Sequence, residues 1–419
     1  MAVVTAGPPV AERVASPVIT RLGERIAASP GDGPALVERF WTDLAHAGGT
    51  PLVDAAGDGE VIATFVWRGT RATTRVLFVP NRIGDREQRS ASLLQHVPGT
   101  DVWHIAYQLR SDHRGSYQFA VDHQPIEDGL SADALQQHLT RLARRGVPDP
   151  LCPQTVPTRW RPGSASVFAL PDAPSEWWRS GAARVAGRVD TVDWSPTAPV
   201  VPRPVHRYRA PGDEAQPLLL LCDGDMWFEH LGLPATLDAA IAVGALPPLT
   251  VLAPSAIDLT HRWTDLAPTG GFADALVAAL PDLAADLGPI RADRLVVAGQ
   301  SLGGLTALYA AARHRDLHGV IAQSPSLWWR PGSAHTVPHL EQLEEPWLAE
   351  VFENAPASST TVRIDVGAHE GAMPQAARQL AEVLAARGQP TRLTVYHGGH
   401  DYPCWRVALL DGLAALLCT

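Results

Sequence analysis

The pattern of hydrophobic positions changes near residue 200. Before that point, short alternating segments separated by turn signals such as Asp58-Gly59 and Pro98-Gly99 predict strands at 61–67, 75–79, 102–107 and 116–120. After it, short apolar runs alternate with Ala- and Leu-rich stretches of helical length. The change in pattern predicts two domains of different architecture.

The second part of the chain alternates strands and helices. The apolar runs predict strands at 217–222, 249–253, 295–298, 319–323, 362–366 and 392–396. The helical stretches lie near 233–243, 273–287, 302–313, 372–387 and 404–417. This order indicates an α/β fold with a parallel-type sheet, whose active site lies at the carboxyl ends of the strands. We expect an α/β-hydrolase domain preceded by a smaller, all-β, immunoglobulin-like sandwich.

The composition places the boundaries between these parts. Residues 1–30 are rich in Ala, Pro and Gly and predict a partly ordered lead-in, followed by the sandwich over 31–147. Five prolines between Pro148 and Pro162 indicate an extended linker, which we place at 148–199. The hydrolase domain is then expected over 200–419.

Charge and cysteine content exclude several classes of protein. A formal net charge of −10 argues against a general nucleic-acid binder. The four cysteines show no C-x-x-C spacing, so neither a disulfide framework nor a metal site is expected. We find no secretory signal and no apolar run long enough to span a membrane, which favours a cytoplasmic protein that needs no membrane and no cofactor.

The stretch Gly299-Gln300-Ser301-Leu302-Gly303 carries the clearest chemical signal. An apolar run, 294–298, precedes it and an Ala- and Leu-rich helix follows it. A serine between glycines, at a turn from a strand to a helix, is typical of the nucleophile elbow of serine hydrolases. The helix N-terminus behind the serine offers free N–H groups that stabilise developing negative charge. Ser301 is therefore the candidate nucleophile.

The order of the remaining catalytic groups in this fold is acid, then histidine. His400 follows the last strand after two glycines and is the candidate general base, with His397 as the alternative. Glu370 lies in the loop after strand 362–366, where an orienting carboxylate belongs, and Asp365 within that strand is the alternative acid. A Ser–His dyad without an acid also stays open.

An oxyanion hole needs two backbone N–H donors. The first is expected at Leu302, directly after the nucleophile. The second is expected in the loop that closes strand 217–222, at Gly224 or Asp225.

Several short motifs together resemble the enterochelin (ferric enterobactin) esterases. The resemblance covers about residues 35–415. In the first half of the chain the motifs are Phe65-Val66-Trp67-Arg68-Gly69, Gly99-Thr100-Asp101-Val102-Trp103, Arg114-Gly115-Ser116-Tyr117 and Asp149-Pro150-Leu151. In the second half they are Asp223-Gly224 with Trp227, Thr260-His261-Arg262, the elbow, Gln323-Ser324-Pro325-Ser326-Leu327-Trp328-Trp329, and Gly398-Gly399-His400-Asp401 with Cys404-Trp405-Arg406. The resemblance implies a two-domain cytoplasmic esterase that hydrolyses the ester (trilactone) backbone of an imported ferric catecholate siderophore. Iron would enter only as part of this small-molecule substrate.

The resemblance also implies catalytic roles for Ser301, His400 and Glu370, and a substrate-contacting role for Arg262. Because guanidinium groups suit planar anionic ligands, other arginines within or beside the motifs are candidate contacts. Tryptophans that follow strand ends are candidates for the pocket wall. The candidate substrate-binding residues are Arg110, Arg114, Arg262, Arg406, Trp227 and Trp329.

Two other functions remain open at this stage. The fold hosts many activities, so a carboxylesterase or acyltransferase acting on another acyl substrate is possible. A siderophore-binding protein without catalysis is the second alternative, against which the paired Ser301 and His400 argue. The sequence does not decide the oligomeric state.

Overall fold

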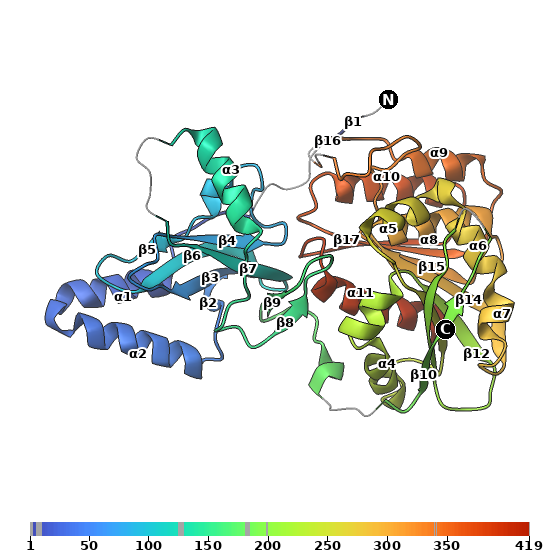
Figure 1. The fold of residues 1–419 in the computed structure, drawn as a ribbon, viewed down its shortest axis with the longest axis horizontal. Coiled ribbons are helices and arrows are strands. Elements are labelled where there is room, and N and C mark those ends of the chain that lie inside the picture. The colour runs from blue at the N-terminus through green and yellow to red at the C-terminus, as the bar shows by residue number, and fades with distance from the viewer. Residues whose placement is uncertain are drawn as a thin grey trace. The chain divides into compact units, whose positions relative to one another are not determined.

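The computed structural model describes residues 3–5, 11–124, 130–180, 185–197, 200–338, 340 and 342–418. The chain forms two compact units, shown as ribbons in Figure 1. The C-terminal unit comprises Met1–Pro8, Ser175–Tyr396 and Trp405–Thr419. The N-terminal unit comprises Pro9–Pro174 and His397–Cys404. The chain therefore returns to the N-terminal unit between the last strand and the last helix.

An eight-stranded sheet with the order β10-β11-β13-β12-β14-β15-β17-β18 organises the C-terminal unit. Its strands are β10 (Arg188–Trp194), β11 (Arg203–Arg209), β12 (Gln216–Leu221), β13 (Thr250–Pro254), β14 (Ile290–Gln300), β15 (Gly319–Gln323), β17 (Thr361–Gly367) and β18 (Thr391–Tyr396). β10 pairs antiparallel with β11, and β11 antiparallel with β13, whereas the remaining pairs are parallel. The six strands predicted after residue 200 are confirmed. The two antiparallel strands at the edge were not predicted, and they make the sheet mixed.

Helices connect these strands. They are α4 (Leu233–Ala242), α5 (Leu259–Leu266), α6 (Phe272–Ala278), α7 (Leu280–Ala284), α8 (Leu302–Arg313), α9 (Trp347–Asn354), α10 (Met373–Ala386) and α11 (Tyr402–Leu417). The single helix expected over 273–287 is two short ones, because Pro281 lies at a position where it starts a new helix rather than continuing one. A short pair of strands, β1 (Val3–Thr5) and β16 (Gln342–Glu344), lies apart from the main sheet.

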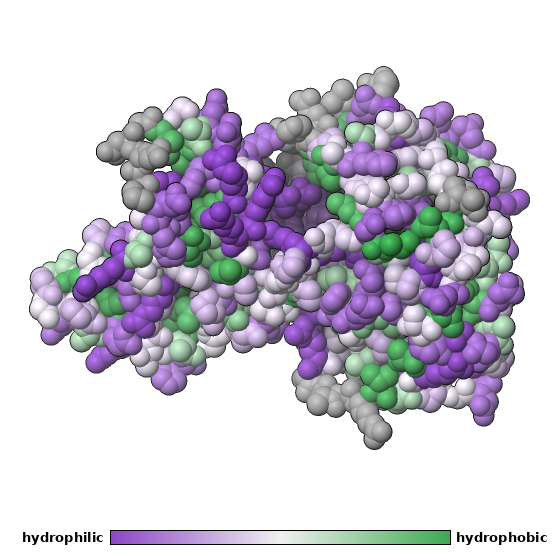
Figure 2. All heavy atoms as spheres, viewed as in Figure 1, coloured by the Kyte–Doolittle hydropathy of each residue, from purple (hydrophilic) through white to green (hydrophobic). Residues whose placement is uncertain are grey.

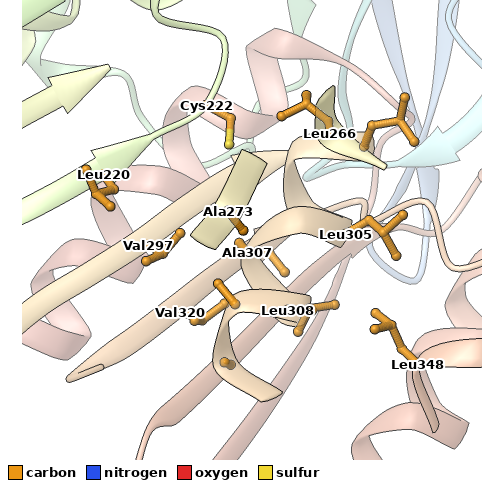
Figure 3. Packing of buried hydrophobic residues seen from close by; sticks show 14 of the residues in the cluster. Leu220, Cys222, Leu266, Ala273, Val297, Leu305, Ala307, Leu308, Val320 and Leu348 are labelled. Atoms are coloured by element: carbon orange, nitrogen blue, oxygen red, sulfur yellow. The ribbon is translucent and has the colours of Figure 1, made fainter. Parts of the chain in front are cut away.

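Alternation along the central strands gives each face of the sheet its own apolar layer. Val297 of β14 and Val320 of β15 lie in one layer with Leu305 and Leu308 of α8, as Figure 3 shows. On the other face, Gly412 of α11 lies so close to Ile321 that a Cβ would be 2.8 Å from the isoleucine side chain. Central strands covered on both faces explain why their sequences are continuous apolar runs.

The N-terminal unit contains two four-stranded antiparallel sheets, with the orders β2-β3-β6-β5 and β4-β7-β9-β8. The strands are β2 (Leu52–Gly57), β3 (Glu60–Arg68), β4 (Arg75–Pro80), β5 (Gln95–His96), β6 (Val102–Arg110), β7 (Arg114–Asp122), β8 (Thr155–Pro157) and β9 (Ser164–Ala169). Phe65 of one sheet lies 4.5 Å from Phe78 and 5.2 Å from Phe168 of the other, measured between ring centroids. The two sheets therefore share one aromatic core, and the four strands predicted here are confirmed.

Three helices cover the outer faces of these sheets. Helices α1 (Pro17–Ala28) and α2 (Gly33–His46) pack on Val66 and Val102, and α3 (Ala132–Ala143) packs on Leu77 and Ala120. Ser16 begins α1 by accepting a hydrogen bond from the Ile19 N–H. Part of the expected lead-in is thus an ordered, capped helix. The expected linker, 148–199, likewise contributes β8 and β9 to one unit and β10 to the other.

The exposed large hydrophobic side chains, such as Val53, Trp160 and Val243, are scattered along the chain. Figure 2 shows hydrophilic and apolar residues interspersed on the face that it displays. Within the described part of the chain, no helix combines the length and the apolar character that a membrane crossing requires.

Candidate active site

Ser301 lies at the turn between β14 and α8 in a strained backbone conformation. Its φ of 58° and ψ of −120° are rare for a residue with a side chain. Hydrogen bonds hold it there: its N–H donates to the Gln323 carbonyl at 2.9 Å, and its carbonyl accepts from the Leu305 and Ser326 N–H groups at 3.0 Å. The Ser301 side chain stays partly exposed, so a substrate can reach the hydroxyl.

The flanking glycines are required by close approach rather than by their own φ angles. A Cβ on Gly299 would lie 2.5 Å from the backbone of Gly303. A Cβ on Gly303 would lie 2.9 Å from the Cβ of Cys222, at the end of the neighbouring strand. Both distances are below ordinary van der Waals contact, so the G-x-S-x-G pattern reflects the tightness of this turn.

Ser326 is a neighbour of the nucleophile that the sequence reasoning did not assign. Its buried hydroxyl lies 3.4 Å from the Ser301 hydroxyl, and its N–H holds the Ser301 carbonyl. It follows β15 by three residues, in a motif noted only for its family resemblance. A serine after the strand beside the elbow is too common a pattern to have indicated this contact.

The proposed oxyanion donors lie on elements that hydrogen bonds tie to the elbow. Leu302 is the first residue of α8, so its N–H is one of those that a helix leaves unpaired at its start. Gly224 follows β12, and a Cβ there would lie 2.0 Å from the Ala253 carbonyl oxygen, which explains the glycine. The next residue, Asp225, accepts a hydrogen bond from the Ala256 N–H at 2.9 Å. The loop after β12 is thereby fixed to the end of β13.

Asp223, in the loop after β12, forms a buried ion pair with Arg262 of α5. Arg262, which is 7% exposed, donates from Nε and Nη2 to the two carboxylate oxygens at 2.7 and 2.8 Å. The Gln300 side chain also donates to Asp223, and Arg262 donates to the Gln300 carbonyl. Bidentate pairing inside the protein supports a role for Arg262 in holding the elbow, rather than the substrate contact expected from the sequence.

Glu370 occupies a buried position after β17. Its Oε1 accepts a hydrogen bond from the Gly367 N–H at 2.7 Å and one from the Ser324 hydroxyl at 2.6 Å. Ser324 in turn accepts from the Trp405 indole at 2.9 Å and contacts the Tyr396 hydroxyl at 3.0 Å. This network fixes the orientation of a carboxylate that is 0% exposed. It supports Glu370 as the acid.

Asp365, the alternative acid, is engaged elsewhere. Both of its carboxylate oxygens accept hydrogen bonds from Arg363 Nε, at 3.0 and 3.1 Å, on the sheet face that α11 covers. Burial raises the pKa of Asp365, and Arg363 opposes this effect. A carboxylate already neutralised within the sheet is a poor partner for a catalytic histidine, which again favours Glu370.

The candidate base His400 follows β18 by four residues, in the segment that belongs to the N-terminal unit. Its carbonyl accepts a hydrogen bond from the Asn81 side chain at 2.9 Å, and the next residue, Asp401, accepts one from the Ser116 N–H at 2.7 Å. The sequence placed this segment in the hydrolase domain. Its place in the N-terminal unit depends on contacts between distant residues, which periodicity does not reveal.

His397, the alternative base, has a partner of its own. Its Nδ1 lies 2.7 Å from a carboxylate oxygen of Asp112, and both side chains are substantially exposed. This arrangement suits a surface ion pair and supports His400 as the base.

The candidate substrate-binding residues divide into buried and accessible ones. Trp227 is 1% exposed and donates to the Gln300 side chain, and Trp329 is 5% exposed and packs edge-on against Trp347. These two rings therefore lie in the core and do not form an open pocket wall. Arg406 is buried and lies 2.7 Å from Glu176.

Arg114 and Arg110 lie in the N-terminal unit. Arg114 is buried and donates to the Pro174 carbonyl, whereas Arg110 is exposed and donates to the Asp58 carbonyl at 2.8 Å. Of the six candidate contacts, only Arg110 presents an exposed side chain.

Over the described residues we find no group of three or more His, Cys, Asp or Glu side chains arranged to hold a metal ion.

A strained serine between a parallel strand and the N-terminus of a helix, with a buried carboxylate after a neighbouring strand, defines a serine hydrolase of the α/β class. Comparison with known families agrees with this class. Residues 62–179 match the family described as enterochelin esterase, N-terminal, and residues 200–416 match the family described as putative esterase. The chain belongs to the enterochelin esterase family and is a hydrolase that acts on ester bonds.

Known relatives resemble the chain over most of its length. An iron(III) enterobactin esterase of Dickeya dadantii is 33% identical over 410 residues, covering 91% of this chain and 93% of the relative. An iron(III) salmochelin esterase of Escherichia coli O6:H1 is 32% identical and covers 88% and 90%. The crystal structure of ferric enterobactin esterase from Salmonella typhimurium superposes with a TM-score of 0.77 at 27% identity, covering 90% of this chain and 98% of that one. The enterobactin esterase of Shigella flexneri, crystallised in the presence of enterobactin, gives 0.75 at 27% identity over 89% and 97%.

Proposed function

We propose that this protein hydrolyses the ester bonds of a ferric catecholate siderophore such as enterobactin, so that its iron can be released in the cytoplasm. The single observation that carries the chemistry is the strained elbow that presents the Ser301 hydroxyl before the N-terminus of α8. The named relatives support the substrate class, because their names state iron(III) enterobactin or iron(III) salmochelin as what they act on.

The reaction would proceed through an acyl-enzyme. The Ser301 oxygen attacks the ester carbonyl carbon while His400 accepts its proton, and the Leu302 N–H with a donor from Gly224 or Asp225 stabilises the oxyanion. The C–O bond of the ester breaks, and His400 returns the proton to the leaving hydroxyl group. Water activated by His400 then cleaves the acyl-enzyme and releases the carboxylic acid. Glu370 orients His400 and stabilises its protonated form.

A chromatographic product assay tests this proposal. Wild-type protein is incubated with ferric and iron-free enterobactin, and linear products are separated and counted by the number of ester bonds cut. The Ser301→Ala variant, folded to the same extent by circular dichroism, is the matched control. Products from the wild type and none from the variant support the proposal, whereas an inert wild type would overturn the proposed substrate.

The same protein distinguishes the alternatives. A general carboxylesterase would turn over p-nitrophenyl acetate readily and leave the siderophores intact, and an acyltransferase would require an alcohol or amine acceptor before product appears. A binding protein without catalysis would bind the siderophore and fail to react with a fluorophosphonate probe at Ser301.

We also infer that the N-terminal unit is an immunoglobulin-like sandwich, which its two antiparallel sheets and shared core support.

A further inference from the structure

Together with the short helix that follows it, the loop after β4 carries more arginines than carboxylates, with Asp85 and Glu87 as the acidic residues. Three arginines lie within eight residues, Arg82 and Arg86 in the loop and Arg89 at the start of the short 3-10 helix Arg89–Ser92. Lost hydration, with a smaller effect of repulsion from Arg82 and Arg89, lowers the pKa of Arg86 to about 10, while Asp401 opposes this change. The repulsion between these guanidinium groups would be reduced by a bound anion.

The side chains of Gln136 and Asp85 hold the backbone of this loop, so the guanidinium groups are not needed to fold it. The Gln136 side chain accepts from the Arg89 N–H and donates to the Arg86 carbonyl, each at 2.9 Å. The Asp85 carboxylate accepts from the N–H groups of Glu87 and Gln88 at 2.7 and 3.1 Å. The loop is therefore preorganised, which lowers the entropy cost of binding a ligand.

The side chains of Arg86 and Arg89 have no ion pair with any residue that the structure describes. Arg89 Nε is buried and makes no hydrogen bond there, and burial lowers the pKa of this guanidinium. Arg86 is exposed, so a ligand can reach it. A buried donor without an acceptor is uncommon in folded proteins and calls for an explanation such as a missing ligand.

The same loop lies against the segment that carries His400. Asn81 donates to the His400 carbonyl, and a Cβ on Gly399 would lie 2.7 Å from the Cβ of Arg82. Arg82 itself adopts a φ of 71°, a strained conformation that is found disproportionately at functional sites. An anion held by this loop would thus be placed beside the proposed general base.

We propose that Arg86 and Arg89 form a recognition site for the anionic iron(III)–catecholate part of the substrate. This inference rests on the proposed function and adds the residues that distinguish the ferric from the iron-free siderophore. Iron binding removes the catechol protons and makes the complex strongly anionic, and a guanidinium can both pair with the catecholate oxygens and stack on the rings. The iron-free siderophore keeps its catechol protons and offers this site little charge.

Calorimetric titration measures the two affinities without turnover if every variant also carries Ser301→Ala. Ferric enterobactin and iron-free enterobactin are titrated into the parent, Arg86→Gln, Arg89→Gln and the double variant. Arg39→Gln is the matched control, because Arg39 is an exposed arginine of α2 in the same unit and loses the same charge. We expect roughly ten-fold weaker binding of the ferric ligand for each arginine removed, since a hydrogen bond to a charged group is worth about that factor. The affinity for the iron-free ligand and for either ligand in Arg39→Gln should change little.

The outcomes distinguish the recognition site from the esterase function. If the Arg86 and Arg89 variants bind ferric enterobactin as tightly as Arg39→Gln does, or lose both ligands equally, the recognition site is overturned while the esterase function stands. If the parent binds ferric enterobactin but the protein with Ser301 restored releases no product, the esterase function fails and the binding comparison still decides the recognition site. A parent that binds neither form overturns both proposals.

Discussion

The exposure of Ser301 depends on a backbone conformation that few residues adopt. Its positive φ is held by the Gln323 carbonyl on one side and by the Leu305 and Ser326 N–H groups on the other. None of these contacts uses the Ser301 hydroxyl. The strain is therefore supported by the backbone, and the hydroxyl is left for chemistry.

Replacement of Ser301 by alanine should abolish ester hydrolysis and leave the fold intact. Alanine fits the same backbone conformation at a similar cost, and loss of a triad nucleophile lowers kcat by on the order of 10⁶. Steady-state turnover and circular dichroism measure the two effects. Ser326→Ala is the comparison, with a much smaller loss, because Ser326 contacts the nucleophile only at 3.4 Å. A folded Ser301→Ala protein with near-native turnover would exclude the proposed mechanism.

Arg262→Ala should lower the stability of the protein and impair all substrates alike. The change leaves Asp223 buried without its bidentate partner, and breaking a buried ion pair costs about 3–5 kcal/mol. Denaturant unfolding gives the loss of stability, and kcat/KM on ferric enterobactin and on p-nitrophenyl acetate gives the loss of activity. A stable variant with a raised KM for the ferric siderophore alone would restore the substrate contact suggested by the sequence.

At the level of elements, the ends of neighbouring parallel strands bring the site together. β14 ends at Gln300, which pairs in register with Gln323 of β15, and Gln323 pairs with Asp365 of β17. The elbow, the Ser324 network and the loop with Glu370 follow these strand ends. Residues far apart in sequence meet there because parallel strands end at one edge of the sheet.

The position of each acid relative to β17 predicts different effects of its removal. Glu370→Gln should lower kcat by roughly 10⁴, the cost of losing an orienting acid, with little change in KM. Asp365→Asn should instead lower stability, because it removes the carboxylate that pairs with the buried Arg363. Unfolding and turnover measured on both variants separate the roles. A reversed result would move the acid to Asp365, and full activity in both would indicate a Ser–His dyad.

Ser324 should act as a positioning residue for this acid. Ser324→Ala removes the hydroxyl that donates to Glu370 at 2.6 Å, so the carboxylate keeps the Gly367 N–H but is held less firmly. We expect a drop of about ten-fold in kcat with KM unchanged. The pH profile of kcat should also shift, because the histidine that depends on the carboxylate loses part of its support. An unchanged pH profile and unchanged kcat would leave Ser324 a purely structural role.

At the level of the whole molecule, the two units have separate cores, so their stabilities can be followed separately. His104 links the stability of the N-terminal unit to pH. Lost hydration, with a smaller effect of Arg13, lowers its pKa from the ordinary value near 6.5 to about 4. Between pH 4 and pH 6.5, His104 is therefore protonated in the unfolded chain and neutral in the folded protein.

As the pH falls from about 6.5 to about 4, His104 should reduce the free energy of unfolding. The slope is at most about 1.4 kcal/mol per pH unit, and the effect is complete below the folded pKa. His104→Gln should flatten this part of the stability profile, measured by denaturant unfolding across this range. His96→Gln, another histidine of the same unit, is the control. Parallel profiles for wild type and His104→Gln would exclude the effect.

The α/β pattern, the elbow and the order of the candidate catalytic groups can all be predicted from the sequence alone. Continuous apolar runs are required of strands covered on both faces, and Gly299 and Gly303 are required by a turn that leaves no room for a Cβ. Local constraints of this kind restrict which residue types can stand at these positions, so they can be recognised in the sequence. Ser301 and Glu370 could accordingly be placed at strand ends from the sequence.

Which polar groups face one another becomes known only from the folded structure. It paired Arg262 with Asp223 and Arg363 with Asp365, gave Glu370 its network, and buried Trp227, which the sequence had assigned to a pocket. It also grouped His397–Cys404 with the N-terminal unit. A charged or aromatic side chain fits the surface, the core or a binding site equally well as a residue type. Its role depends on contact partners that are tens to hundreds of residues distant in the sequence, and the local hydrophobic pattern does not identify these partners.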